Sequence, residues 1–266
     1  MDLPIQPDFG AFDAAYAAGR PQIVWTRLVN DLDTPVSAFL KMAKDKPFGF
    51  LFESVQGGEQ RGRYSVLGYA PDLIWRARGD NCELSTDGKT YTSLPDKPLV
   101  SLRKIQAASK VDIPDELPPM AAGLFGYLGY DTVRQVEHLP NVNPDPIGTP
   151  DAIMCRPTLI AIFDQIAQEI ILTTTVRPKD GIDAKTAYAD AANRLNAASD
   201  LLEQSMSPPR HSAPDMPKIT PTMGATAQSF GRKVQTAKDY ITAGDVFQVV
   251  IGQRLSAPLK TSPFSL

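Results

Sequence analysis

Apolar and polar residues alternate over short stretches along most of the chain, and this pattern is typical of β-strands. We predict strands at residues 20–25, 50–52, 63–69, 72–77, 82–85, 158–163 and 169–175. Glycine-containing turns connect the second of these strands to the third and the fourth to the fifth. Because hairpins outnumber β-α-β units, we expect an α+β fold with mostly antiparallel sheets packed against helices.

Longer stretches with helical periodicity lie between the strands. Helices are predicted at residues 35–44, 98–108, 183–203 and 228–243, and residues 131–137 could form a further one. Thr34 precedes Pro35, so the first of these helices has a suitable cap and a proline in its first turn. Gly244 is suited to end the last one, because glycine readily adopts the left-handed conformation of a helix C-cap.

Composition divides the chain near residue 204. Residues 1–203 hold almost all of the predicted strands, whereas residues 204–226 are rich in proline and resemble a linker. Residues 227–266 then supply one helix and one strand, the strand at 245–255. One helix and one strand cannot form a domain by themselves. We therefore expect this segment either to join the earlier core or to begin a domain that continues beyond Leu266.

The overall charge and the cysteines exclude several classes of protein. The 27 basic and 30 acidic side chains are well mixed, so no basic stripe suggests nucleic-acid binding. Cys82 and Cys155 are far apart and lack partners at metal-ligand spacing, which argues against a disulfide scaffold or a zinc site. No apolar segment approaches the ~20 residues that cross a bilayer, and the N-terminus lacks the apolar core of a signal peptide. We expect a cytoplasmic protein without membrane contact.

Catalytic motifs are absent from the sequence. There is no GxxxxGK[ST] phosphate loop and no GxGxxG motif. The histidines, His138 and His211, lie outside known catalytic patterns. Gly123, Gly126 and Gly129 recur among apolar residues, and we interpret them as core packing in which backbones approach closely. The residues by themselves therefore show no complete catalytic constellation.

Two positions combine polar residues with strand patterns. Glu53 and Ser54 directly follow Phe50-Leu51-Phe52. Such a pair either caps the turn locally or holds a ligand, and the residues by themselves favour local capping. Gln248 lies among aliphatic residues of the strand predicted at 245–255. Its simplest interpretation is a buried amide that hydrogen-bonds to the backbone.

Four blocks in the chain closely resemble the large subunits of anthranilate synthases, in the chorismate-utilising enzyme family. They are TPVSAFLKMA at 34–43, FLFESVQGGEQRGRYSVLGYAP at 50–71, GLFGYLGYDTVRQVEHLP at 123–140 and ITAGDVFQVVIGQRL at 241–255. The resemblance covers nearly all of residues 20–266 and implies the α/β sandwich of that family, incomplete at the C-terminus. Family members are much longer, and the match ends where their catalytic half begins.

The resemblance assigns roles to individual residues. It implies that Leu51, Glu53, Ser54 and Val55 line part of a feedback site for tryptophan, within a regulatory region at residues 1–203. A carboxylate and a hydroxyl can bind an α-ammonium group, and strand side chains can cover an indole. Related enzymes that add water to chorismate have a lysine base where this chain has Gln248. We therefore expect Gln248 to line the chorismate pocket without acid–base chemistry.

The resemblance also implies an overall reaction. Enzymes of this type convert chorismate and ammonia to anthranilate and pyruvate with Mg²⁺, and a glutamine amidotransferase subunit (component II) supplies the ammonia. The magnesium ligands and main catalytic residues are then expected beyond Leu266, so this chain alone is predicted to be inactive. Two alternatives stay open, namely aminodeoxychorismate synthase, which makes a folate precursor, and a non-catalytic amino-acid-binding module.

Overall fold

The computed structural model describes residues 3–54, 62–140, 144–206, 220–259 and 263–265. The chain forms two compact units, Met1–Met206 and Ser207–Leu266. The linker predicted at 204–226 lies for the most part outside the described residues. In the described ranges, no helix is long and apolar enough to cross a membrane.

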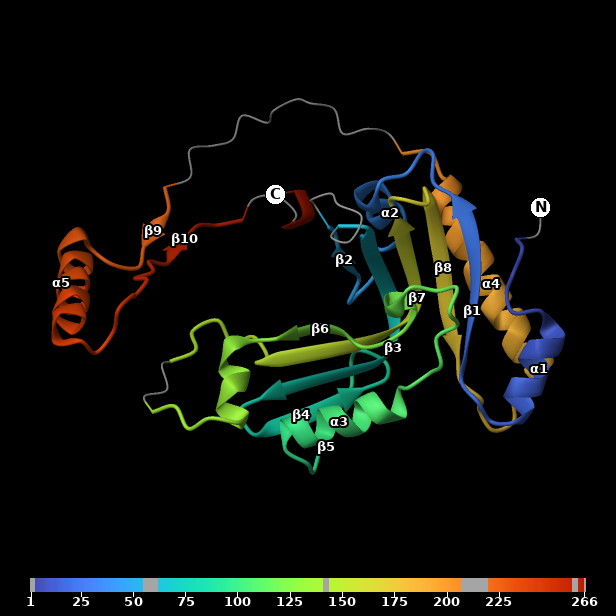
Figure 1. Ribbon diagram of the computed structural model, residues 1–266, viewed down its shortest axis with the longest axis horizontal. Helices are drawn as coiled ribbons and strands as arrows, with labels where there is room; N and C mark the ends of the chain where they lie inside the picture. Colours follow the sequence, from blue (N-terminus) through green and yellow to red (C-terminus); the bar gives the residue numbers. More distant parts are fainter. Residues whose placement is uncertain (1–2, 55–61, 141–143, 207–219, 260–262, 266) are drawn as a thin grey trace. The chain divides into compact units, whose positions relative to one another are not determined.

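The first unit contains four α-helices, eight strands and two 3₁₀ helices in its described residues (Figure 1). The α-helices are α1 (Phe9–Ala17), α2 (Pro35–Met42), α3 (Pro98–Ala108) and α4 (Ala184–Glu203). The strands are β1 (Gln22–Val29), β2 (Phe50–Phe52), β3 (Tyr64–Arg78), β4 (Asn81–Ser85), β5 (Thr92–Leu94), β6 (Phe125–Leu128), β7 (Ala152–Asp164) and β8 (Glu169–Val176). The 3₁₀ helices are η1 (Pro119–Ala121) and η2 (Tyr130–Gln135).

All eight strands form one sheet in the order β1-β8-β7-β3-β4-β5, with β2 added to β3 and β6 added to β7. Every pairing in this sheet is antiparallel. The predicted fold class is therefore confirmed, as are the predicted helices at 35–44, 98–108 and 183–203 within two residues at each end. The α-helix α1 was not predicted, because its sequence FGAFDAAYA shows little separation of apolar and polar faces.

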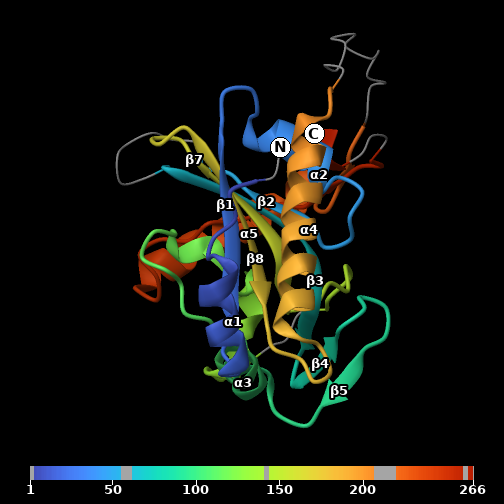
Figure 2. The same ribbon diagram turned by 90° about the vertical axis from the view of Figure 1, so that its right-hand side faces the viewer.

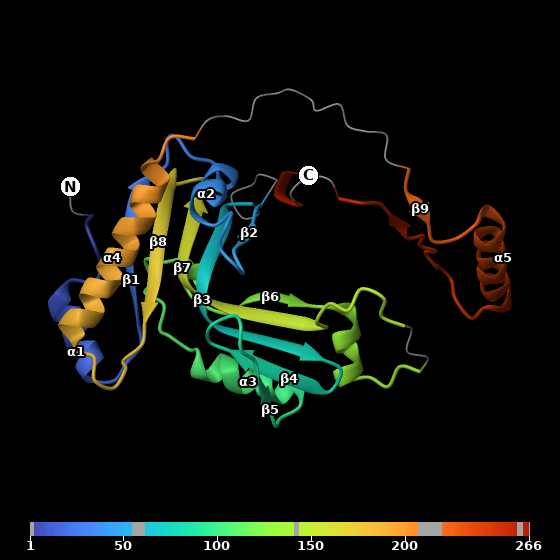
Figure 3. The ribbon, with the colours of Figure 1, turned by 180° about the vertical axis from the view of Figure 1, so that it is seen from behind.

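The two longest strands bend where prolines face each other. Pro71 of β3 is opposite Pro157 of β7, and the register shifts between Pro71 and Leu73. Proline has no N–H to donate to the ladder, so the pairing is interrupted here and the strands change direction. Figures 1 and 3 show the result, because β3 and β7 each contribute to two differently oriented halves of the sheet. The strands predicted at 63–69 and 72–77 are thus the two halves of one bent strand.

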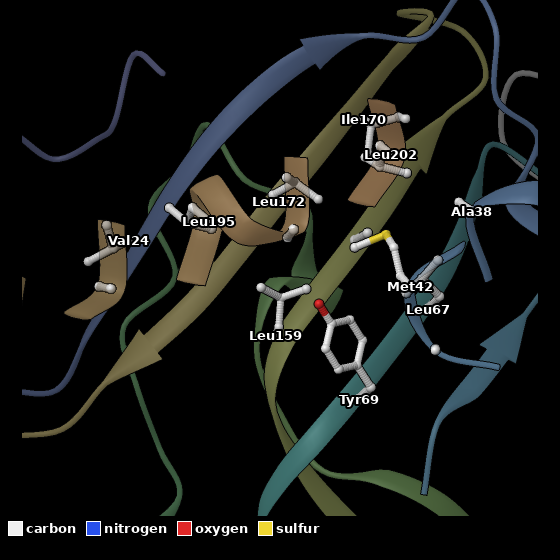
Figure 4. Packing of buried hydrophobic residues seen from close by; sticks show 14 of the residues in the cluster. Val24, Ala38, Met42, Leu67, Tyr69, Leu159, Ile170, Leu172, Leu195 and Leu202 are labelled. Atoms are coloured by element: carbon white, nitrogen blue, oxygen red, sulfur yellow. The ribbon is translucent and has the colours of Figure 1, made fainter. Parts of the chain in front are cut away.

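Helices cover one face of the half that contains β1 and β8. Figure 2 shows α1 and α4 side by side against this face, and α2 packs beside α4. Successive strand residues point to opposite faces, so Val24, Leu172 and Leu159 pack against the helices, as Figure 4 shows for this cluster. The intervening residues, such as Ile171, form a second cluster with Leu117 and the segment before β6. Both faces are buried, which explains why these strands are continuous apolar runs.

The other half of the sheet has its own small core. Trp75 of β3 is 1% exposed and donates its indole N–H to Ser101 Oγ of α3 at 3.0 Å. Ala77, Cys82 and Ala152 complete the buried part of this cluster. The buried cysteine therefore acts as a small apolar side chain in packing.

The glycine block at 123–129 makes the close approach that was predicted, but it lies at an exposed position. A Cβ added at Gly126 would lie 1.9 Å from the backbone oxygen of Ile153. Strand β6 pairs only with the first half of β7, so Tyr127 and Leu128 are 43% and 49% exposed. The interpretation of this block as core packing was therefore wrong for Tyr127 and Leu128, because an added edge strand has few neighbours, whereas Phe125 does pack against a buried cluster.

The second unit contains α5 (Ala227–Ala243), a short β-ladder of β9 (Thr222–Met223) with β10 (Leu255–Ser256), and η3 (Pro263–Ser265). The helix begins after the Thr226 cap and ends at Gly244, which has a φ of 84°, so the predicted helix and its glycine cap are confirmed. The strand predicted at 245–255 is wrong except for Leu255. Phe247 is 96% exposed. Residues 245–254 pair with no strand in the described chain, and a lone apolar segment cannot form a sheet.

Candidate functional site

The hairpin of β2 and β3 carries the site expected from the sequence. Phe50 pairs with Gly68, Leu51 with Leu67 and Phe52 with Val66, so the predicted hairpin is confirmed. A Cβ at Gly68 would lie 2.6 Å from the Phe50 ring. Glycine at this position therefore lets the ring lie over the backbone of β3.

Aromatic rings gather beside this hairpin. The ring of Phe50 stacks on that of Phe125 with centroids 4.9 Å apart, and Phe52 lies 5.0 Å from Phe50. Phe52 is 49% exposed, whereas Leu51 packs on the opposite side against the helix-covered core. The hairpin end thus presents a partly exposed aromatic surface that can contact a flat apolar ligand.

The polar residues at the end of β2 are only partly satisfied by the protein. The backbone N–H of Ser54 donates to Oγ of Ser65 at 3.2 Å, and Ser65 is fully buried. Within the described residues, the Ser54 hydroxyl and the exposed Glu53 carboxylate have no hydrogen-bond or ion-pair partner. The turn that these side chains were expected to cap lies outside the described residues, so local capping of it stays a prediction; among the described residues, both side chains are available to a ligand.

An ion pair fixes the start of the returning strand. Arg63 Nε lies 3.0 Å from both carboxylate oxygens of Asp164, the last residue of β7. The backbone N–H groups of Ile166 and Ala167 also donate to this carboxylate. Burial raises the pKa of Asp164, but the hydrogen bonds from Arg63 and the two backbone donors outweigh this and hold the pKa below its ordinary value.

We expect Asp164→Asn to destabilise the first unit by about 2 kcal/mol at neutral pH, because the amide lacks the negative charge and one of the two acceptor oxygens that face Arg63. A lowered native pKa makes the ionised form stabilising above the unfolded pKa, about 3.9, and this stability is lost as the pH falls. The difference between wild type and variant should therefore persist down to about pH 5 and shrink as the pH falls further, through the lowered pKa of the native state. Urea unfolding at several pH values measures it.

Asp115→Asn is the matched control, since Asp115 is exposed and makes no hydrogen bond or ion pair with the described residues. It should leave stability unchanged across the same pH range. A pH-independent difference for Asp164→Asn would contradict the assignment of its stability to the ionised carboxylate.

The structure does not bring all predicted site residues together. Leu51, Glu53 and Ser54 lie on the hairpin, and Val55 lies outside the described residues. Gln248 is exposed in the irregular segment of the second unit, so the buried amide expected there is not observed. Its predicted role in a chorismate pocket stays a prediction.

The described residues do not form a binding site for Mg²⁺. In the described ranges, no group of three or more His, Cys, Asp or Glu side chains is arranged to hold a metal ion. In the described part of the hairpin, Glu53 is a single exposed carboxylate, and the Asp164 carboxylate beside the returning strand is paired with Arg63. No chemical step of this part of the chain is therefore assigned to the metal.

Three residues that organise the hairpin were not predicted from the sequence, namely Ser65, Arg63 and Asp164. Asp164 is far from Arg63 in the chain, so only strand pairing shows that they meet. One local signal was available, because both are charged residues at the end of an apolar strand pattern, where a buried charge needs a partner.

Comparisons with known proteins agree on one family. A family model described as chorismate binding enzyme matches residues 51–266. Anthranilate synthase component 1 of Cereibacter sphaeroides is 43% identical over 97% of this chain and 52% of its own length. The protein of that name from Synechocystis sp. is 36% identical over 98% of this chain and 53% of its own length. The chain thus spans about half the length of the curated relatives it matches.

A solved structure supports the fold. The crystal structure of anthranilate synthase component I from Streptococcus pneumoniae TIGR4 matches with a TM-score of 0.61 at 23% identity. The match covers 89% of this chain and 50% of that chain. At this identity the likeness concerns the fold, and it agrees with antiparallel sheet packed against helices.

Proposed function

This chain belongs to the family of chorismate binding enzymes, and we propose that it is part of an anthranilate synthase component I. The proposed reaction converts chorismate and ammonia to anthranilate and pyruvate, a step toward tryptophan. The observation that carries the proposal is the 43% identity to a protein of that name over 97% of this chain. The relatives from Cereibacter and Synechocystis both have this name, which favours anthranilate over aminodeoxychorismate as the product.

We further propose that residues 1–203 form the regulatory region and that tryptophan binds at the β2–β3 hairpin. The free carboxylate of Glu53 would accept a charge-assisted hydrogen bond from the α-ammonium group. The Ser54 hydroxyl would bond to a polar group of the same ligand, while Leu51 and Val55 would contact the indole. The partly exposed phenylalanines, which lie on the opposite side of β2 from Leu51, supply further apolar surface near the end of the strand.

The remaining assignments concern the rest of the enzyme. Residues 227–266 are proposed to begin the chorismate-binding domain, with Gln248 facing chorismate. A glutamine amidotransferase subunit is the proposed source of ammonia, and Mg²⁺ the proposed metal of the complete active site. A cytoplasmic location suits a biosynthetic enzyme of this kind.

The proposal is tested by completing the chain with a relative. Residues 1–266 are joined to the part of the Cereibacter sphaeroides protein that follows the matched region. We expect this chimera to form anthranilate from chorismate, ammonium and Mg²⁺, because a complete active site is restored. Residues 1–266 by themselves should form none. Anthranilate fluorescence measures both.

The relative's second half by itself is the control and should be inactive, which shows that this chain contributes to the enzyme. A folded chimera without activity would contradict the proposal. Turnover of chorismate by residues 1–266 would contradict the assignment of the main chemistry to the other half. Tight tryptophan binding by a chain whose chimera is inactive would instead indicate a non-catalytic amino-acid-binding module.

A further inference from the structure

A polar cavity lies in the first unit and shares no residue with the hairpin site. It has a volume of about 180 Å³. Its walls come from α1, α4, the end of β8 and the bend of β3 and β7. The proline-induced bend thus opens a space beside the helix layer, which a straight pair of strands would fill.

The cavity carries an excess of positive charge. Its basic lining residues are Arg156, Arg177, Lys179 and Arg194, and its acidic ones are Asp72 and Asp190. The Asp72 carboxylate forms an ion pair with Arg156, whose Nε donates to Oδ1 of Asp72 at 2.6 Å. Asp190 is exposed and forms no ion pair with any described residue. The remaining cations therefore have at most one carboxylate among them.

Two of these arginines have no carboxylate partner in the described part of the chain. Arg194 donates from Nε to Thr174 Oγ1 at 3.0 Å, and its two terminal nitrogens have no acceptor among the described residues. Arg177 donates to the backbone oxygens of Ser109 at 2.7 Å and Lys110 at 3.4 Å, which are neutral acceptors. Burial is the largest effect and lowers the pKa of both guanidinium groups, and for Arg177 the neighbouring Arg156 lowers it further. The carboxylates of Asp72 and, for Arg194, also Asp190 act in the opposite direction without offsetting the burial. Partly desolvated cations of this kind favour a bound counter-charge.

We propose that this cavity binds a phosphoryl-sized oxyanion, either inorganic phosphate or the phosphate group of a small metabolite. Guanidinium groups present parallel donors that match the oxygens of phosphate, and they do so better than lysine. The Thr175 hydroxyl, which makes no hydrogen bond to any described residue, adds a neutral donor at the wall.

The volume limits what else could bind. A water occupies about 30 Å³ in the liquid, so the cavity has room for a tetrahedral anion with a few waters. It is smaller than the roughly 300 Å³ at which pockets for drug-sized ligands begin. A nucleotide would therefore not fit inside, whereas a phosphate monoester could place its phosphate in the cavity and its remainder in solvent. The inference does not depend on the proposed enzymatic activity.

Titration of the 266-residue protein with sodium phosphate tests the proposal, with sodium chloride at matched ionic strength as the reference. We expect saturable heat and a raised melting temperature with phosphate only. Arg194→Gln and Arg177→Gln should each weaken phosphate binding by about 10-fold or more, because a charge-assisted hydrogen bond is lost. A small phosphate monoester that binds more tightly than phosphate would identify the metabolite as the source, and equal binding would identify the free ion.

Arg103→Gln is the matched control, since Arg103 on α3 is exposed, makes no hydrogen bond or ion pair to the described residues, and changes the net charge equally. It should bind phosphate as wild type does. Lys179→Gln is a further test variant in case a variant of one of the half-buried arginines does not fold. The Lys179 side chain is exposed, so its replacement should not disturb packing. It should weaken binding several-fold. Absence of saturable phosphate binding, or equal affinity in all variants, overturns the proposal.

Discussion

Replacing Ser54 by alanine is expected to raise the tryptophan concentration that half-inhibits the completed enzyme by about 10-fold or more. The reason is that the hydroxyl has no partner among the described residues, so its hydrogen-bonding capacity is available to the ligand. Its removal leaves a polar group of bound tryptophan without a partner, which costs about 1–3 kcal/mol. The backbone bond from Ser54 to Ser65 does not involve this hydroxyl and should persist.

Glu53→Gln should weaken inhibition by a similar or larger factor, because it removes the negative charge opposite the α-ammonium group. The measurement is the inhibition curve of the chimera at fixed chorismate. Ser93→Ala and Glu137→Gln are matched controls, since both side chains are exposed and make no hydrogen bond or ion pair with the described residues. Both controls should be inhibited as the parent chimera is.

Comparison of the two site variants with the two controls distinguishes a loss of tryptophan binding from a general effect on the protein. If Ser54→Ala and Glu53→Gln retained the parent inhibition curve, tryptophan would not bind at this hairpin. If all four variants lost inhibition together, the effect would not be specific to the site. The chain by itself should bind tryptophan weakly, because its free polar groups form only one side of a site.

Gly126→Ala is expected to destabilise the first unit by about 3 kcal/mol or more. The added methyl carbon would lie 1.9 Å from the backbone oxygen of Ile153 and 3.0 Å from Cα of Met154. Both belong to β7, so no side-chain rotation relieves the overlap, and the pairing of β6 with β7 must open. Urea unfolding followed by the fluorescence of the two tryptophans, both of which are buried in this unit, measures the loss.

Gly10→Ala is the control for a glycine replacement in the same unit. Its added carbon would lie 3.4 Å from Asp8 Oδ1, an ordinary contact with a side chain. Alanine is favoured over glycine in a helix, so this variant should keep or slightly raise stability. Equal urea midpoints for Gly126→Ala and wild type would show that β6 does not lie against β7 as described.

Local patterns predicted the elements that depend on near neighbours in the chain. The helix at 35–42 has its reciprocal cap between Thr34 and Ser37, and the hairpin at 50–68 follows from two apolar runs around a glycine turn. Both were predictable because the cap and the paired strands belong to neighbouring parts of the sequence, although both elements also pack on distant ones. The predictions failed where a distant partner was needed, as at 245–254, where an apolar pattern was present but the described chain offers no neighbouring strand.

The site shows the same division. The sequence identified Glu53 and Ser54 as an unusual polar pair, but the bond from the Ser54 backbone N–H to Ser65 arises only through strand pairing. Likewise, Arg177 and Arg194 are ordinary residues in sequence, and the packing of α4 on β8 places both at one cavity. Their lowered pKa values arise mainly from burial, which cannot be predicted from a local sequence pattern.

By itself, the sequence determined the α+β class, most of the helices and strands and the family resemblance, because these depend on residue type and spacing along the chain. Only the tertiary structure decided which side chains are satisfied and which are free, where the sheet bends and which charges share a cavity. Those properties depend on contacts between residues far apart in the chain, such as Arg63 and Asp164, which are 101 positions apart. Hydrogen bonding and desolvation act through space, so they become defined only once the chain has folded.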